Sequence, residues 1–297
     1  LRLDSDEAVR NIPPSDYSVA TLWITAYVLL KVTNTGSKFY MIQDYEPLFY
    51  PAGSTSAQAE LTYRFGFHGI ANTESIRDIY ERDFGGRGVV LRPCVDTKIF
   101  YPAAELRGHG VKRLFCYTRP GTPRNGFELA AVVLRRLKDQ YGKEIEIVCA
   151  GAAWDPEDFG LAGVVRNMGL LAYADTADLY RSCHAGLVMM MTRHPSYLPF
   201  ELMACGCLVV SNLNPANAWF LKDGENCLLS PPTVSCLATT VTRALDNYSA
   251  LATLRRAAAN RVRNRHGDWE KSLEQVARFM NDLQSGGEHL ISETSVV

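Results

Sequence analysis

The stretch RHPSYLPFELMACGCLVVSN, residues 193–212, decides the fold class of this chain. A polar and aromatic loop leads into a short helix, the helix ends at Gly206, and the apolar residues 207–211 follow at once as a strand. A helix joined directly to a strand is half of an α/β unit. We therefore expect an α/β fold with this stretch at its functional centre.

The start of this helix suits a nucleotide that is bound through its phosphates. Its backbone N–H groups and the positive end of the helix dipole favour an anion such as a diphosphate, and Pro199 is tolerated in a first turn. Glu201 is placed to accept hydrogen bonds from two vicinal hydroxyls of a ribose. An ordinary helix N-terminus, with Ser196 as its cap and Glu201 beside the dipole, is the open alternative.

Length and composition limit the class of protein. The 297 residues are enough for two compact domains, and a formal net charge of -1 gives no basic excess for nucleic acid. Eight cysteines stand in apolar segments without a C-x-x-C pair, which is typical of buried thiols in a reducing compartment, the cytoplasm. The longest apolar run, 20–32, is too short to span a bilayer and predicts a buried helix.

Helical and strand patterns alternate along the first hundred residues. We expect helices at 19–32, 56–65 and 74–84, and strands at 39–43, 68–72 and 89–91. Such alternation indicates a parallel sheet covered by helices on both faces, with ligands at the carboxyl ends of its strands.

Polar residues follow the first of these strands. Gln43, Asp44, Tyr45 and Glu46 place two carboxylates and a phenol at the edge where ligands bind. Asp44 or Glu46 could orient an acceptor hydroxyl or act as a base. Helix capping or a turn is the alternative for Glu46, whereas the functional interpretation is favoured for Asp44.

A second α/β half follows the extended segment 92–103, and we place the domain boundary near 104. Arg119 and Arg124 lie in the turn after the next strand, where two guanidinium groups can converge on one phosphate. His194 borders this expected phosphate site without a partner that would make it catalytic. The expected strands are 113–118, 145–150, 164–168, 185–191, 207–211 and 227–230, and the expected helices are 127–141, 175–183, 233–247, 249–264 and 268–283.

The last of these helices is amphipathic and needs a surface to cover. Its expected apolar face comprises Leu273, Val276, Ala277, Met280 and Leu283. No basic amphipathic helix of the kind that binds membrane surfaces is evident from the pattern.

Four landmarks make the chain resemble the retaining glycosyltransferases of the GT-B fold, the family 4 type. RPCVDTKIFYP at 92–102 looks like that family's interdomain P-N-G-V-D…F-x-P signature. Arg119 and Arg124 fall where the family has a pair that grips the diphosphate, and PFELMACGCLVVSN resembles its E-A-M-A-C-G-x-P-V-V helix, with Glu201 on the ribose-binding glutamate. DGENCLLSPP at 223–232 resembles a further family segment.

The resemblance implies two Rossmann-like domains that face each other across a cleft, the N-terminal one shortened. Residues 1–103, joined by the C-terminal helix 268–284, would hold the acceptor, and residues 104–267 the nucleotide sugar. FYMIQDYEPLFYPAGS at 39–54 and TYRFGF at 62–67 are similar to bacterial rhamnosyltransferases of surface-polysaccharide assembly. The implied enzyme is a hexosyltransferase whose donor is a deoxythymidine-diphosphate sugar, rhamnose first among the candidates.

The roles that follow from the resemblance are specific. Arg119 and Arg124 would stabilise the charge on the leaving diphosphate without a metal or other cofactor, and Asp44 would orient the acceptor, so these three are the expected catalytic residues. The expected donor-binding residues are Arg119, Arg124, His194, Ser196, Tyr197, Glu201 and Asn212, and the acceptor-side residues are Gln43, Asp44, Tyr45 and Glu46. The expected partners are the nucleotide-diphosphate sugar, a carbohydrate or lipid-linked glycan acceptor and the inner face of the membrane, but not nucleic acid.

Three departures from the family keep alternatives open. Arg193 stands where the first glutamate of the family's E-x7-E pair belongs, so the loop 193–197 would replace that contact. Gln43-Asp44 occupies the neighbourhood of the usual catalytic histidine, and the short N-terminal half lacks its glycine-rich loop, as in a fragment or a trimmed variant. A catalytically inactive sugar-nucleotide or glycan-binding module is therefore the alternative. An epimerase or phosphorylase is weaker, because a phosphorylase needs a lysine in the crevice and Lys222 is the nearest candidate.

Overall fold

A computed structural model of the chain describes residues 6–103, 110–194 and 196–285. The chain divides into two compact units. The first comprises residues 1–92 and 270–297, and the second residues 93–269. The predicted boundary at residue 104 falls outside the described residues, and the predicted domain ranges stay predictions.

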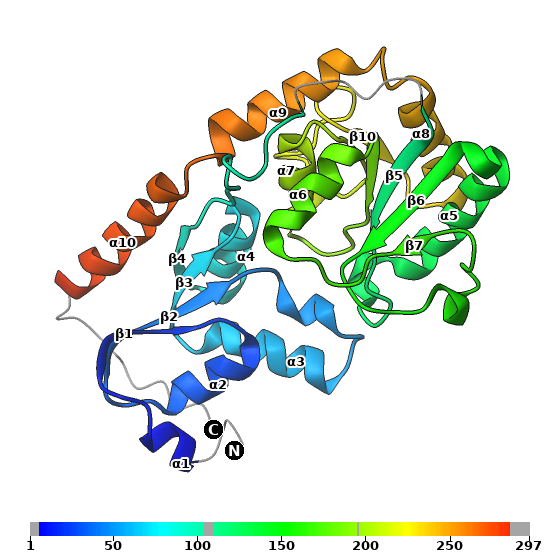
Figure 1. Cartoon of the computed structure of the whole chain (residues 1–297). Coiled ribbons are helices and arrows are strands. Elements are labelled where there is room, and N and C mark those ends of the chain that lie inside the picture. The colour runs from blue at the N-terminus through cyan, green and yellow to red at the C-terminus, as the bar shows by residue number, and fades with distance from the viewer. Residues whose placement is uncertain (1–5, 104–109, 195, 286–297) are drawn as a thin grey trace. The chain divides into compact units, whose positions relative to one another are not determined.

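The first unit is a parallel sheet of four strands in the order β1-β2-β3-β4 (Figure 1). Its strands are β1 (Ser15–Ala20), β2 (Thr35–Ile42), β3 (His68–Ala71) and β4 (Arg87–Val90). Its helices are α1 (Asp6–Arg10), α2 (Trp23–Lys31), α3 (Ser54–Leu61) and α4 (Glu74–Phe84), with α10 (Trp269–Ser285) near the end of the chain. The predicted helix at 74–84 is confirmed to the residue, because Thr73 caps its start and the left-handed Gly85 ends it.

Strand β1 corrects the prediction of one buried helix over 19–32. The polar run 15–20 forms an edge strand, whose Ser18 hydroxyl donates to Thr35 Oγ1 of β2 (2.9 Å). Helix α2 starts only at Trp23 and has Ala26 and Leu29 as its buried residues. The sequence pattern missed the strand because an edge strand pairs on one side and tolerates polar residues.

Helix α10 is amphipathic as predicted, but the face that packs is only partly the predicted one. Leu273 is 52% exposed and Val276 is 7% exposed. The ring of Phe279, absent from the predicted face, contacts Phe39 of β2 and His68 of β3 (centroid distances 6.4 and 6.2 Å). The predicted face is therefore right at Val276 and wrong at Leu273, because the Phe279 ring packs on the sheet and turns Leu273 outward.

The second unit is a parallel sheet of six strands in the order β10-β9-β8-β5-β6-β7. Its strands are β5 (Lys112–Tyr117), β6 (Ile145–Ala150), β7 (Arg166–Asn167), β8 (Ala185–Val188), β9 (Leu208–Asn212) and β10 (Leu228–Ser230). Its helices are α5 (Phe127–Tyr141), α6 (Tyr173–Ser182), α7 (Leu198–Ala204), α8 (Val234–Asp246) and α9 (Ala252–His266). The observed α5 and β6 match the predicted bounds, whereas β7 and β8 are shorter than predicted.

Strand β8 stops at Val188 because side chains take over the backbone of the next residues. Asn212 accepts from Met190 N (2.7 Å) and donates to Met190 O (2.9 Å). Asn214 donates to the carbonyl oxygens of Met190 and Thr192. These amide contacts replace the strand pairing that the apolar run 185–191 predicted.

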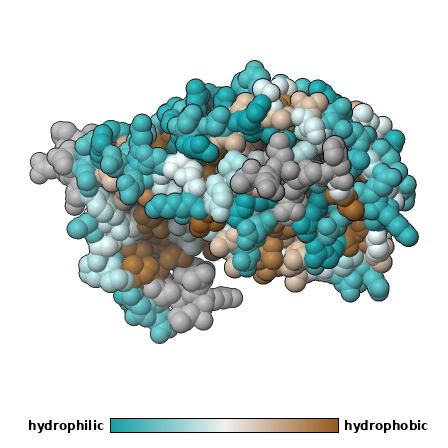
Figure 2. Space-filling view, turned by 45° about the horizontal axis from the view of Figure 1, so that its top comes forward, coloured by the Kyte–Doolittle hydropathy of each residue, from teal (hydrophilic) through white to brown (hydrophobic). Residues whose placement is uncertain are grey.

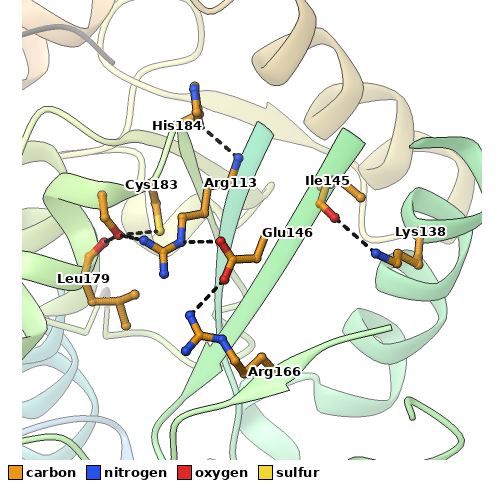
Figure 3. A network of polar contacts seen from close by, with 9 residues as sticks. Arg113, Lys138, Ile145, Glu146, Arg166, Leu179, Cys183 and His184 are labelled. Carbon is orange, nitrogen blue, oxygen red and sulfur yellow. Dashed lines mark hydrogen bonds and ion pairs between the residues drawn. The ribbon is translucent and has the colours of Figure 1, made fainter. Parts of the chain in front are cut away.

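An ion-pair network lies at the amino-terminal edge of this sheet (Figure 3). Glu146 pairs with Arg113 and Arg166 (3.0 and 2.8 Å), which connects β5, β6 and β7. The backbone N–H of Arg113 donates to His184 Nδ1 (3.0 Å). Ligands of parallel sheets bind at the carboxyl ends of the strands, which is the opposite edge. We therefore assign these ion pairs to the stability of the fold.

Candidate active site

The strand order of the second unit indicates where a ligand would bind. From β5 the sheet continues to β6 and β7 on one side, and to β8, β9 and β10 on the other. Such a reversal leaves a crevice at the carboxyl ends of the two central strands. The turn 118–126 follows β5 and the loop 189–197 follows β8, so both predicted phosphate-binding segments lie at this switch point.

A backbone hydrogen bond joins the turn to the loop. Met191 N donates to Arg124 O (3.1 Å). Gly126 is left-handed (φ 59°), and a Cβ there would lie 2.9 Å from Met191 Cε. Arg119 is exposed and Arg124 half-buried. The structure thus brings the predicted Arg124 turn beside the start of the predicted donor loop.

Ser196 has a strained backbone. It is the one non-glycine residue with positive φ (59°) among those that the structure describes. Tyr197, not Ser196, is the N-cap of α7, and Ser196 Oγ only accepts a long contact from Leu198 N (3.5 Å). The predicted Ser196 cap is therefore a weak interaction. Strain of this kind is typical of ligand-binding loops, where the surrounding structure maintains it.

Glu201 lies on α7 and interacts with tyrosine side chains. Burial raises the pKa of its carboxyl to about 7, and a hydrogen bond with Tyr180 opposes that shift. Burial and then the Glu201 charge raise the pKa of Tyr173 and of Tyr180. The sequence analysis missed both tyrosines, although Tyr180 lies within the predicted helix 175–183 and Tyr173 lies just before it.

His194 has a buried ring nitrogen. Its Nδ1 atom has no hydrogen-bond partner within the described ranges. Burial lowers the pKa of the imidazole to about 4, so the ring is neutral at physiological pH. The ring meets Tyr197 edge to face (centroids 6.1 Å apart). His194 therefore offers a neutral hydrogen-bonding group at the switch point rather than a cation.

The remaining residue predicted to bind the donor, Asn212, lies at the same edge, but its side-chain amide is already hydrogen-bonded within the protein. Its amide oxygen and nitrogen both bond the backbone of Met190. Asn212 is 3% exposed. In this arrangement Asn212 fixes the loop that carries His194.

The predicted acceptor-side residues follow β2 of the first unit. Gln43 is exposed, with its amide donating to Thr21 O (3.0 Å). Asp44 is 6% exposed, and its Oδ1 accepts from Tyr45 N (2.7 Å). Tyr45 packs its ring on Tyr63 (centroids 5.7 Å apart).

Glu46 is bound within the first unit. Its Oε2 accepts from the backbone N–H of Trp23 at the start of α2 (2.7 Å) and from the Tyr40 hydroxyl (2.8 Å). Burial raises the pKa of Glu46 to about 7, and these two hydrogen bonds oppose the shift. The placement agrees with the helix-capping alternative.

Neither a metal cluster nor a spanning helix is found among the described residues. Within 6–103, 110–194 and 196–285, no group of three His, Cys, Asp or Glu side chains could hold a metal ion. Across the same residues, no helix is both long and apolar enough to cross a bilayer. The cysteines in this part of the chain are thiols, most of them buried.

Two sequence matches concern one family. Residues 112–242 match the family described as WsaF, C-terminal domain, and residues 4–75 match WsaF, N-terminal domain. The O-antigen biosynthesis protein RfbC of Myxococcus xanthus is 44% identical over 289 residues, which is 97% of this chain and 22% of that protein. The chain thus spans less than a quarter of the relative's length.

Solved structures share the architecture. Anabaena HepE in complex with UDP-glucose is 19% identical, with a TM-score of 0.73 over 90% of this chain and 79% of HepE. Sucrose-phosphate synthase from Thermosynechococcus elongatus is 17% identical, with a TM-score of 0.72 over 91% of this chain and 74% of that one. Likeness at such low identity establishes the fold alone, and it confirms the predicted α/β class with two Rossmann-like domains. The chain therefore has the GT-B type of fold, and it carries matches to both the N-terminal and the C-terminal domain of WsaF.

Proposed function

We propose that the chain transfers a sugar from a nucleoside-diphosphate donor, deoxythymidine-diphosphate rhamnose, to a growing surface polysaccharide, with retention of configuration and without a metal. The observation that carries the proposal is the meeting of the Arg124 turn and the loop 189–197 at the switch point of the six-stranded sheet. The identity to an O-antigen biosynthesis protein supports a polysaccharide product. The UDP-glucose bound by HepE supports a nucleotide sugar.

The charge that develops on the leaving diphosphate is the main electrostatic demand of this reaction. Arg119 and Arg124 would meet it, because guanidinium groups bind phosphate oxygens through fixed pairs of N–H donors. The strained Ser196 would let the loop present its backbone to the same anion. These groups act on the transition state more than on the bound donor, and they therefore lower the barrier.

The donor's two sugars would meet different groups. Glu201, in its ionised form, would accept hydrogen bonds from the ribose hydroxyls. His194 would face the transferred sugar in place of the missing first glutamate, as a neutral donor or acceptor. Tyr197 lies between His194 and Glu201 in the sequence, and its ring meets the His194 ring edge to face.

The acceptor would be oriented by the first unit. Asp44 follows β2 and carries a carboxylate that could bind the attacking hydroxyl. In a retaining transfer the acceptor attacks from the face that the diphosphate leaves, so Asp44 would position the hydroxyl rather than remove its proton first. Gln43 is the exposed neighbour that would assist.

The test is calorimetric titration with deoxythymidine diphosphate, uridine diphosphate and guanosine diphosphate in the absence of divalent metal. We expect one nucleotide to bind, and Glu201→Ala to weaken it. Glu225→Ala, which removes an exposed carboxylate from a turn of the same unit, is the matched control. Absence of binding for all three nucleotides would contradict the proposal.

A binding module without catalysis is the second candidate. Arg193 in place of the first glutamate favours it, because the usual contact to the donor sugar is missing. This candidate predicts nucleotide binding with no release of nucleoside diphosphate from a nucleotide sugar in the presence of acceptor glycans. Turnover would eliminate it.

A further inference from the structure

Helix α9 concentrates positive charge in a chain that is nearly neutral. Its sequence ATLRRAAANRVRNRH contains five arginines and a histidine and no acidic residue, whereas the whole chain has a formal net charge of -1. The sequence pattern predicted a helix here, at 249–264, and the small residues Ala258 and Ala259 form part of its buried side.

Packing fixes which side of α9 faces outward. The helix lies against α7, with Ala258, Val262 and His266 buried, and His266 meets the ring of Phe200 (centroids 4.7 Å apart). Arg255 belongs to this inner side, because it is 5% exposed and donates to the Tyr248 hydroxyl (2.8 Å). The other four arginines lie on the outer side, with Arg256, Arg263 and Arg265 exposed and Arg261 half-buried.

At 100° per residue the outer arginines form two rows. Arg256 and Arg263 lie along one border of the outer face, and Arg261 and Arg265 along the other. No carboxylate of residues 6–103, 110–194 and 196–285 makes a salt bridge with any of these four. Their charge is thus not neutralised by this part of the chain.

An aromatic side chain borders the second row. Arg261 donates to the backbone carbonyl of Trp219 (3.2 Å), and Trp219 is 36% exposed. Its indole also packs on Phe220 (centroids 5.6 Å apart), which fixes its position. Helix α9 is drawn along the top of Figure 1, and the view that brings this side forward is largely hydrophilic (Figure 2).

We propose that the outer face of α9, with Trp219 at its border, binds the anionic headgroups of a lipid bilayer. Arginine rows that form no salt bridge with the described carboxylates attract a negatively charged membrane surface. A tryptophan that is partly buried and partly exposed is the side chain best suited to the headgroup level. A nucleic acid is disfavoured, because the chain as a whole has no basic excess.

The experiment is co-sedimentation of the whole chain with vesicles of phosphatidylglycerol and of phosphatidylcholine, at low and at high salt. We expect binding to the anionic vesicles, little binding to the zwitterionic ones, and release by salt. The double variants Arg261→Gln/Arg265→Gln and Arg256→Gln/Arg263→Gln should each weaken vesicle binding by about tenfold or more.

The matched control removes the same charge elsewhere. Arg135 and Arg136 are exposed on α5 of the same unit, so Arg135→Gln/Arg136→Gln should leave vesicle binding within about twofold of the unmodified chain. The proposal is overturned if the chain ignores anionic vesicles, if the control loses as much affinity as the α9 variants, or if salt has no effect.

This proposal does not rest on the transferase reaction. Nucleotide binding measured by calorimetry should be the same in the α9 variants and in the unmodified chain, because α9 carries none of the expected donor-binding residues. Loss of vesicle binding with intact nucleotide binding supports the membrane surface alone. Loss of nucleotide binding in every protein, with vesicle binding intact, would count against the proposed function and not against this surface.

Discussion

The two units present polar residues after their strands, yet they use them differently. After β5 and β8, Arg119 is exposed, His194 keeps a buried nitrogen without a described partner, and Ser196 is strained. After β2, Glu46 is held by Trp23 N and the Tyr40 hydroxyl. At the edge of the second unit, the His194 nitrogen is not used by a described hydrogen bond and could bind a ligand. At the edge of the first unit, the Glu46 carboxylate is already hydrogen-bonded within the fold.

The largest expected effect concerns the diphosphate. Arg124→Ala should lower turnover by about 10² to 10³, because it removes a charged donor from the developing negative charge, while the melting temperature stays nearly unchanged. The rate of nucleoside diphosphate release from the nucleotide sugar measures it. Arg136→Ala on α5 is the control, and a variant that unfolds with unchanged specific activity would contradict the assignment.

The next effect tests the structural use of the first unit's edge. Glu46→Ala should destabilise the chain by about 1–3 kcal/mol, because the N–H of Trp23 and the Tyr40 hydroxyl lose their buried acceptor. Urea denaturation measures this, with the exposed Glu60→Ala as control. Equal stability of the two variants would place Glu46 among the groups available to a ligand.

Ser196 gives a backbone test of the second unit's edge. Ser196→Gly should retain nucleotide affinity and stability, because glycine adopts φ near +60° without strain. Ser196→Val should cost about 1–2 kcal/mol of stability and weaken the nucleotide. Ser235→Val, on the exposed side of α8, controls for the change in side chain. If valine is accepted at Ser196 as readily as at Ser235, the loop is not strained in solution.

The smallest effect is the pH dependence of nucleotide binding through Glu201. Its pKa of about 7 means that the carboxyl gains a proton as the pH falls below 7, and a protonated carboxyl accepts less well from two ribose hydroxyls. Affinity should fall several-fold over the first pH unit below 7. Glu201→Gln should bind more weakly and show a shallower pH dependence, the remainder coming from the nucleotide phosphates. Parallel pH profiles for the two proteins would remove Glu201 from the site.

The raised pKa also has a consequence for folding. Because the folded-state pKa of Glu201 lies above its ordinary value of 4.5, the native chain holds this proton over a pH range in which the unfolded chain has lost it. Its contribution to stability therefore declines as the pH rises from about 4.5 to about 7 and is constant above. Glu201→Gln should reduce that slope in denaturation measured across this range.

The local pattern of the sequence was sufficient for many elements. Helix α4, helix α5 and strand β6 have the predicted bounds, because caps, glycines and hydrophobic periodicity act within a few residues. The motif at 199–212 likewise predicted a helix, a glycine and a strand, which α7, Gly206 and β9 confirm. The GT-B class followed from this alternation and from the resemblance together.

Contacts between distant residues decided the rest. Strand β1 exists because residues 15–20 pair with residues 35–40, and β8 ends early because Asn212 and Asn214 bind the backbone of Met190. The phenols around Glu201 and the buried nitrogen of His194 depend on neighbours that no local pattern specifies. The sequence determined the elements and the residue types at the strand ends. Only the tertiary structure decided which of these residues are engaged by the fold and which are left to a ligand, because burial and hydrogen-bond satisfaction depend on the whole fold.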